Sequence, residues 1–325
     1  MKPEHAGGAK VMDSFVLSLS MSAFTLSERR SGLLAAVVSY LFWGFMSVYW
    51  SLLAEADSWE VIAHRVLWSL VFLLLAMALR GKLNDVFETA RLLWADRRRL
   101  MIMLSAAFFA ALNWWINVIA VLTDHVVELG IGTFLTPLIS VSLGVIFFGE
   151  RLSLLKKGAI ALAAAGVGIM IVGFGHFPWI SLGVSLTWGI YGALKKKLML
   201  EAWVSIILEA VLMLPAALAY IGWLHAGGLG HFGTGGIGLT LALAGTGIMT
   251  SIPLICFTLA AMKLPMNVLG FCQYIAPVMT LLLGIFWFGE PFGGRELLPL
   301  IFIWSGIALF IFAELRPLPN GRDTL

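Results

Sequence analysis

The sequence predicts an all-α integral membrane protein with ten transmembrane helices, arranged as two inverted five-helix repeats. Three observations lead to this prediction: the composition, a series of long apolar segments and an internal duplication. Of the 325 residues, 60% are hydrophobic and 12% are charged, whereas soluble domains usually carry about 25% charged residues. A soluble protein must present much polar surface to water, so this composition favours lipid as the solvent.

Apolar segments recur from Gly32 onward, and each is long enough to cross a hydrocarbon layer of about 30 Å. We expect the spans at residues 32–53, 60–79, 101–122, 126–148, 155–175, 179–195, 202–224, 236–259, 266–288 and 297–315. Before them, Val11–Leu26 is interrupted by Asp13 and several serines, which is unlike the continuous apolar region of a signal peptide. We therefore interpret residues 1–30 as a disordered tail or an over-extended start, with Met21 as the initiator.

The distribution of basic residues predicts the orientation. Nearly all of the 21 lysines and arginines fall in the amino-terminal tail, after the even-numbered spans or at the ends of those spans, as Lys195 does at the end of the sixth. Arg295 on the opposite side and Arg65 inside the second span are the exceptions. Because basic residues concentrate in cytoplasmic loops, both termini are expected in the cytoplasm. The net charge of +3 thus belongs to membrane-flanking loops and does not indicate a nucleic-acid partner.

An internal duplication accounts for the number of spans. Residues 129–150 recur as residues 269–290 without a gap, and Trp43-Gly44 is weakly matched by Trp188-Gly189. The identical positions in the first copy are Leu129, Gly130, Pro137, Leu143, Gly144, Phe148, Gly149 and Glu150.

The duplication divides the chain into a first repeat, residues 31–175, and a second repeat, residues 178–315, before a cytoplasmic tail at 316–325. Each repeat has an odd number of spans, so the second copy must cross the membrane in the opposite orientation. Many carriers are built from two inverted halves that enclose a substrate site near the bilayer midplane.

Polar, ionisable or helix-breaking residues inside the spans are candidates for a substrate pathway, because such residues are costly in lipid and mark function. The candidates are Arg65, Asn113, Asn117, Glu128, Pro137, Gln273, Tyr274 and Pro277. Arg65 and Glu128 lie at similar depth, and we expect them to form an ion pair. The alternative for each candidate is structural: an ion pair, an interhelical hydrogen bond or a tight packing seam.

Glu209 is a candidate for proton coupling. It lies about two helical turns into the seventh span and occupies the position equivalent to Arg65 in the other repeat. A carboxyl group removed from water can exchange a proton at physiological pH. A structural, hydrogen-bonded glutamate is the alternative.

The sequence contains no H-E-x-x-H, G-x-S-x-G, Walker or G-x-G-x-x-G motif, so neither enzyme activity nor a cofactor is expected. Cys256 and Cys272 lie in apolar segments and indicate neither a disulfide framework nor a metal site. Ten spans in two repeats favour a secondary transporter in the lipid bilayer, with a small-molecule solute and protons as candidate partners. The competing interpretation is a non-transporting membrane scaffold or regulatory subunit.

Several short motifs along the chain point to a known family. They are His64-Arg65-Val66 with Trp68-Ser69, Asn113-Trp114, Glu128 with Leu129-Gly130, Tyr191-Gly192 with Lys195-Lys196-Lys197, Pro253-Leu254, and Gln273-Tyr274-Ile275 with Pro277. With these motifs the chain resembles the RarD family of EamA-type carriers, in the drug/metabolite transporter superfamily, from about Ser31 to Ala313. The resemblance implies ten helices in two inverted repeats, a bacterial inner membrane and export of small metabolites or drugs. Members are often labelled chloramphenicol-sensitivity proteins.

Overall fold

The computed structural model describes residues 6–123, 125–174, 177–287, 289 and 294–315, and every regular element in this part of the chain is a helix. The helices are α1 (Ala6–Ser51), α2 (Ser58–Leu79), α3 (Leu83–Ala95), α4 (Arg97–Leu122), α5 (Val126–Phe148), α6 (Leu154–Phe174), α7 (Trp179–Leu198), α8 (Ala202–Ala226), α9 (Gly236–Lys263), α10 (Met266–Cys272), α11 (Ile275–Phe286) and α12 (Gly294–Leu315). Asp57 and Asp96 are the N-cap residues that precede α2 and α4, and both carboxylates accept hydrogen bonds from free N–H groups in the first turns of these helices.

Nine of the predicted spans are long and apolar enough to cross a membrane within the described residues, with α10 and α11 together forming one of them. The remaining predicted span is α7, whose three lysines and hydroxyl side chains lower its hydropathy. It packs between α4, α5 and α9, so protein rather than lipid surrounds much of it. With α7 the described part of the chain has ten membrane-spanning segments, which confirms the predicted fold class.

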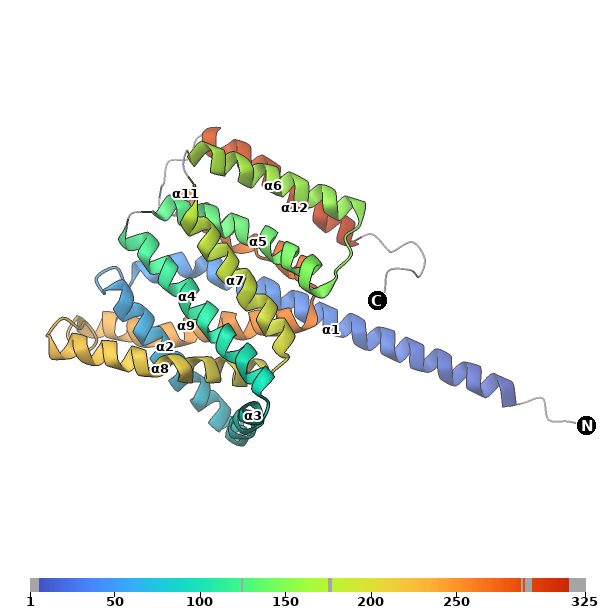
Figure 1. Ribbon diagram of the computed structural model, residues 1–325, viewed down its shortest axis with the longest axis horizontal. Coiled ribbons are helices and arrows are strands. Elements are labelled where there is room, and N and C mark those ends of the chain that lie inside the picture. The colour runs from blue at the N-terminus through green and yellow to red at the C-terminus, as the bar shows by residue number, and fades with distance from the viewer. Residues whose placement is uncertain (1–5, 124, 175–176, 288, 290–293, 316–325) are drawn as a thin grey trace, which may run out of the picture.

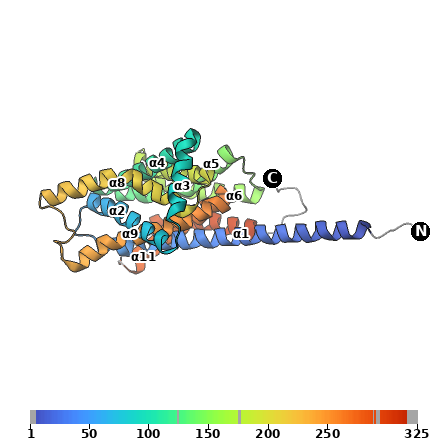
Figure 2. The same cartoon turned by 90° about the horizontal axis from the view of Figure 1, so that it is seen from below.

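The first span belongs to a longer helix than the sequence predicted. α1 begins at Ala6 and includes most of the expected amino-terminal tail, while its membrane-spanning part is Ser27–Ser51. The amino-terminal portion of α1 projects beyond the bundle in both views (Figures 1 and 2). Residues 1–5 and the carboxy-terminal tail lie outside the described residues. The domain boundaries at residues 30, 175 and 315 therefore stay a prediction.

Two elements differ from the expected pattern. The connection after the second span contains α3, which has few buried residues and joins α2 to α4. The ninth span is interrupted at Gln273–Tyr274, between α10 and α11. Pro277 has no N–H to bond the carbonyl group of Gln273 four residues earlier, which weakens the helix at this point. Its counterpart Pro137 lies inside α5, which stays continuous.

Reciprocal contacts show that the two repeats are inverted. At the edge of the bundle α6 lies along α12 (Figure 1). A Cβ atom at Gly166 of α6 would lie 2.5 Å from the carbonyl oxygen of Pro299, and one at Gly306 of α12 would lie 2.7 Å from that of Ala159. Gly166 and Ala159 correspond to Gly306 and Pro299 at the repeat offset, so each glycine packs on the equivalent part of the other helix. This exchange of contacts requires the two fifth helices to be antiparallel.

The same reciprocity relates the first helices of the repeats. α1 packs on α9 and α11, and its counterpart α7 packs on α4 and α5. Gly44 of α1 faces Met279, whereas Gly189 of α7 faces Ile139, the residue equivalent to Met279. Glycine permits this close approach because it has no side chain to separate the helices.

One pair of equivalent interfaces is not alike. α2 packs closely along α9, where a Cβ atom at Gly247 would lie 2.3 Å from the backbone carbonyl group of Trp68. The equivalent pair, α8 and α4, has much less contact. The two halves therefore share a fold, but the second span of the first half packs closely on the third span of the second half, whereas the reverse pair does not.

Candidate functional site

A cavity lies in the centre of the bundle, between the two repeats. Its lining comes from α2 and α4 of the first repeat and from α7, α8 and α9 of the second. The lining residues are Val66, Ser69, Ala110, Trp114, Trp188, Tyr191, Ile206, Glu209, Ala210, Met213, Thr250 and Leu254. The cavity volume is about 20 Å³, which is room for roughly one water molecule. A metabolite can enter only if the surrounding helices move apart.

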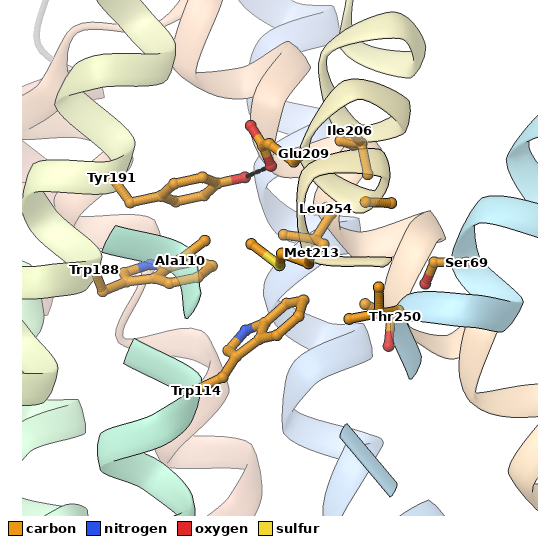
Figure 3. A pocket seen from close by; sticks show the side chains of 12 residues that line it. Ser69, Ala110, Trp114, Trp188, Tyr191, Ile206, Glu209, Met213, Thr250 and Leu254 are labelled. Carbon is orange, nitrogen blue, oxygen red and sulfur yellow. Dashed lines mark hydrogen bonds between the residues drawn. The ribbon is translucent and has the colours of Figure 1, made fainter. Parts of the chain in front are cut away.

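A charged network lies at one end of the cavity. Lys195 Nζ donates hydrogen bonds to Glu209 Oε1 at 2.7 Å and to Ser205 Oγ at 2.6 Å. The Tyr191 hydroxyl donates to Glu209 Oε2 at 3.0 Å, and this bond is drawn in Figure 3. All four residues are buried. The carboxylate thus has a cation and a hydroxyl donor as partners, which is the arrangement that a buried charge requires.

This network corrects the assignment of Lys195 to the set of membrane-flanking basic residues. Lys195 is 1% exposed and points into the bundle, whereas Lys197, two residues later, is exposed. Consecutive residues on a helix point about 100° apart, so a run of three lysines can be split between the interior and the surface. Composition alone cannot show which lysine points inward.

Aromatic rings form one side of the cavity. Trp114, Trp188 and Tyr191 extend toward its centre beside Met213, and Ser69 and Thr250 lie across from them (Figure 3). Trp188 also contacts Trp43, with ring centroids 5.1 Å apart. These two tryptophans are the pair matched by the internal repeat, so the pseudo-symmetry axis passes near this contact. Aromatic walls are typical of sites for flat organic solutes.

Arg65 lies beside the opposite part of the cavity. Its Nε donates a hydrogen bond to the Thr250 hydroxyl at 3.0 Å. Its guanidinium carbon lies 4.7 Å from the centre of the Trp114 ring and 5.1 Å from that of Trp50. Thr250 and Trp114 both line the cavity. The expected ion pair between Arg65 and Glu128 is therefore wrong, because the structure engages each residue elsewhere.

Glu128 binds the start of α7. Its Oε1 accepts a hydrogen bond from the Ile180 N–H at 2.6 Å, and its main-chain carbonyl accepts one from Ser181 Oγ at 2.5 Å. The residue before α7 is Pro178, which supplies no side-chain cap. The first N–H groups of a helix need acceptors and attract negative charge. Glu128 meets this need and lies outside the cavity lining.

The two asparagine candidates join α4 to α7. Asn113 Nδ2 donates to the Val184 carbonyl group and to Thr187 Oγ1, both at 2.9 Å. Asn117 donates back to the Asn113 carbonyl group at 2.8 Å. Neither asparagine lines the cavity. Their observed contacts are interhelical or local hydrogen bonds.

The candidates of the fourth and ninth spans meet each other away from the cavity. Ser140 Oγ donates to Gln273 Oε1 at 3.0 Å, and Gly270 packs on the Pro137 carbonyl group. Tyr274 and Pro277 are buried, and the Tyr274 hydroxyl has no hydrogen-bond partner in the described part of the chain. Arg65 contacts cavity-lining residues from two other helices, Thr250 of α9 and Trp114 of α4.

The loop between α8 and α9 closes one end of the bundle. Glu60 of α2 is fully buried and accepts hydrogen bonds from the N–H groups of His231 at 2.7 Å and Phe232 at 3.3 Å. The ring Nδ1 of His231 lies 2.8 Å from the other oxygen of Glu60. Nearby, the Tyr220 hydroxyl donates to Asp57 at 2.9 Å. These contacts hold the loop against α2 on the predicted outer side.

Sequence reasoning found Glu209 but missed its partners. The available signal was the four-residue spacing of Tyr191 and Lys195, which places both side chains on one face of α7. A buried glutamate needs a cation at a similar depth. Lys195 belongs to α7 and Glu209 to α8, so only the packing of the two helices brings them together. Within the described residues, no cluster of histidine, cysteine or carboxylate side chains could hold a metal ion.

The chain matches known proteins over nearly all of its length. The profile of the EamA-like transporter family matches residues 30–172 and again residues 178–312. A protein of Vibrio cholerae named "Uncharacterized transporter" is 35% identical over 283 residues, covering 87% of this chain and 92% of that protein. "Protein RarD" of Streptomyces exfoliatus is 35% identical over 300 residues, covering 92% and 94%.

A further relative, "Chloramphenicol-sensitive protein RarD" of Pseudomonas aeruginosa, is 30% identical over 283 residues, covering 86% of this chain and 92% of that protein. A solved structure titled "Crystal structure of protein" has a TM-score of 0.66 at 17% identity, covers 88% of this chain and 99% of its own, and supports the fold alone. Two matched repeats and relatives of nearly full length agree with the inverted halves described above. The chain belongs to the EamA-like transporter family and is related throughout its membrane domain to proteins named RarD.

Proposed function

We propose that this protein is a secondary transporter that exports small metabolites or drugs across the bacterial inner membrane by alternating access. The solute binds in the central cavity, where the Lys195–Glu209 pair, Trp114 and Arg65 surround it. Both termini lie in the cytoplasm in this proposal. The name of the Pseudomonas relative makes chloramphenicol one solute to test.

The observation that carries the proposal is the unequal packing of equivalent helices around the cavity. α2 and α9 are in close contact, whereas α8 and α4, which correspond to them, are not. Exchanging these two arrangements between the repeats would close the cavity on one side and open it on the other. Inverted-repeat carriers alternate access in this way. A scaffold with one conformation does not require one of two equivalent interfaces to be closely packed and the other loosely packed.

The proposal assigns proton coupling to Glu209. In the structure Glu209 is paired with Lys195, and it would give up this charge pair by binding a proton. A proton and the ion pair are therefore alternatives, and switching between them would change the contact between α7 and α8. Such a switch can link a proton gradient to helix movement because each conformation favours one of the two states.

Transport can be measured in proteoliposomes loaded with radiolabelled chloramphenicol or with members of a metabolite panel. We expect exchange faster than in protein-free liposomes, and we expect Arg65→Ala to abolish it without loss of folded protein. Gln273→Ala removes the hydrogen bond from Ser140, which joins two helices away from the cavity. Comparing it with Arg65→Ala distinguishes the loss of a contact between helices from the loss of a contact at the cavity. If no member of the panel moved faster than in empty liposomes, the scaffold or regulatory interpretation would replace this proposal.

Proton coupling has its own test. Glu209→Gln should transport solute at a rate that no longer responds to a pH gradient across the membrane. Glu88→Gln is the matched control, because Glu88 is an exposed residue of α3. A Glu209→Gln variant with the pH response of the unmodified protein would remove this residue from the mechanism.

A further inference from the structure

The cavity has two cations beside it, and only one of them is neutralised by the protein. Lys195 forms an ion pair with Glu209 at 2.7 Å. Arg65 forms no ion pair within the described residues; its polar contact is the neutral hydroxyl of Thr250. A charge held in a membrane span without a counter-ion is costly, and such residues mark substrate pathways.

The surroundings of Arg65 stabilise its charge only in part. Trp50 and Trp114 place their rings 5.1 Å and 4.7 Å from the guanidinium carbon. A cation attracts the face of an aromatic ring, but the ring carries no net negative charge. Thr250 engages Nε, and the described residues provide no hydrogen bond to the two terminal nitrogens. These nitrogens carry four N–H donors in a planar arrangement that matches the two oxygens of a carboxylate.

Arg65 also lies directly behind the cavity lining. Two of its contacts, Thr250 and Trp114, are part of the cavity lining. The remaining lining is aromatic or aliphatic apart from Ser69 and the paired network of Tyr191 and Glu209. Glu209 in the lining and the two cations in contact with lining residues, Arg65 and Lys195, together carry one positive charge in excess.

We infer that the transported solute is a small organic carboxylate, whose two oxygens bind the terminal nitrogens of Arg65 while its flat apolar body packs against Trp114. This inference rests on the proposed function and names its substrate class. A solute anion would supply the missing counter-ion, and a charge-assisted bidentate bond is strong in a buried site. A cationic solute would face two cations and one carboxylate, and a neutral solute would leave Arg65 unpaired.

The test compares carboxylates with neutral molecules of the same shape. Indole-3-acetate and indole-3-acetamide form one pair of probes, and phenylacetate and phenylacetamide form a second. Their affinities for the purified full chain in detergent can be measured by calorimetry. We expect each carboxylate to bind roughly ten- to hundredfold more tightly than its amide, since each of the two hydrogen bonds in the bidentate pair is stronger with a charged acceptor by about five- to tenfold. Phenyl phosphate distinguishes a planar carboxylate from a tetrahedral anion and should bind more weakly than phenylacetate.

Variants of Arg65 then assign the preference. Arg65→Gln should bind a carboxylate and its amide equally, and Arg65→Lys should retain part of the preference because it keeps the charge but loses the planar fork. Arg80→Gln is the matched control, because the Arg80 guanidinium lies 5.0 Å from the Trp203 ring but does not contact the cavity lining. Thermal unfolding of each variant checks that it is folded. A merely structural Arg65 would change stability without changing the preference for carboxylates.

Several results would overturn the inference: equal affinity of the unmodified protein for carboxylates and amides, no binding of either carboxylate, or a preference that persists in Arg65→Gln. The comparison in the unmodified protein needs no variant to fold. Exchange of the same probes in proteoliposomes separates this inference from the transport proposal. Exchange of amides but not carboxylates would refute the carboxylate and retain transport, whereas carboxylate binding with no exchange of any probe would refute transport and retain the anion site.

Discussion

Replacing Lys195 by methionine tests the energetic role of the buried ion pair. Methionine has a similar length and fills the space of the lysine stem, so the change removes mainly the ammonium group. Glu209 would keep the hydrogen bond from the Tyr191 hydroxyl at 3.0 Å but lose the one from Lys195 at 2.7 Å. Ser205 Oγ would lose its bond at 2.6 Å to the same ammonium.

The expected loss of stability is about 3–5 kcal/mol, the typical cost of removing one partner of a buried ion pair, because the Glu209 carboxylate is left buried without a cation. A neutral interhelical hydrogen bond in a membrane protein averages only about 0.6 kcal/mol, which is too little to produce such a loss.

Unfolding titrations of the Lys195→Met variant and of the unmodified protein in mixed detergent micelles at pH 7 would measure the loss.

Two further variants complete the comparison. Lys195→Met combined with Glu209→Gln should recover most of the lost stability, because no buried charge is left unpaired. Lys197→Met is the control, since Lys197 is exposed on the same helix end. A Lys195→Met variant that lost less than about 1 kcal/mol would refute the view that Lys195 neutralises Glu209.

Three other changes probe the packing around the site. Gly166→Ala should destabilise the protein by about 1–3 kcal/mol in thermal unfolding, because its Cβ would lie 2.5 Å from the Pro299 carbonyl oxygen; Gly168→Ala, with open space around its Cβ, should not. Glu128→Ala should cost about 1–2 kcal/mol by uncapping α7, and transport by the folded fraction should persist; loss of transport at full stability would return Glu128 to the pathway. Glu60→Ala should free the α8–α9 loop and accelerate amide hydrogen exchange there, and unchanged exchange would show that other contacts hold the loop.

Much of the fold was predictable because the membrane imposes a simple pattern. A span must be long and apolar, and the repeat at residues 129–150 and 269–290 defines two halves with an odd number of helices. The structure has both features, and the reciprocal packing of Gly166 and Gly306 confirms the inversion. The amphipathic α3 and the interruption before Pro277 were not predicted. The first is too short and polar to resemble a span, and the second depends on local geometry, since the equivalent Pro137 leaves α5 continuous.

The site was less predictable than the fold. Depth along a span can be read from the sequence, and it predicts that Arg65 and Glu209 occupy equivalent positions in the two repeats. Depth does not show which direction a side chain faces or which neighbour it meets. Glu128 was therefore expected to form an ion pair with Arg65, although it binds the start of α7. Lys195 was grouped with the basic residues that flank the membrane, although it is buried against Glu209.

The sequence by itself thus determined that the chain lies in a membrane, that it has ten spans and that its halves are inverted, because hydropathy and repetition are properties of the chain alone. Only the tertiary structure decided which buried charges are paired. Lys195 and Glu209 belong to different helices, and their 2.7 Å contact exists because α7 and α8 bring the two side chains together beside the cavity that Glu209 lines. The same packing leaves Arg65 beside aromatic rings and a hydroxyl group, without a carboxylate of the described protein to neutralise it.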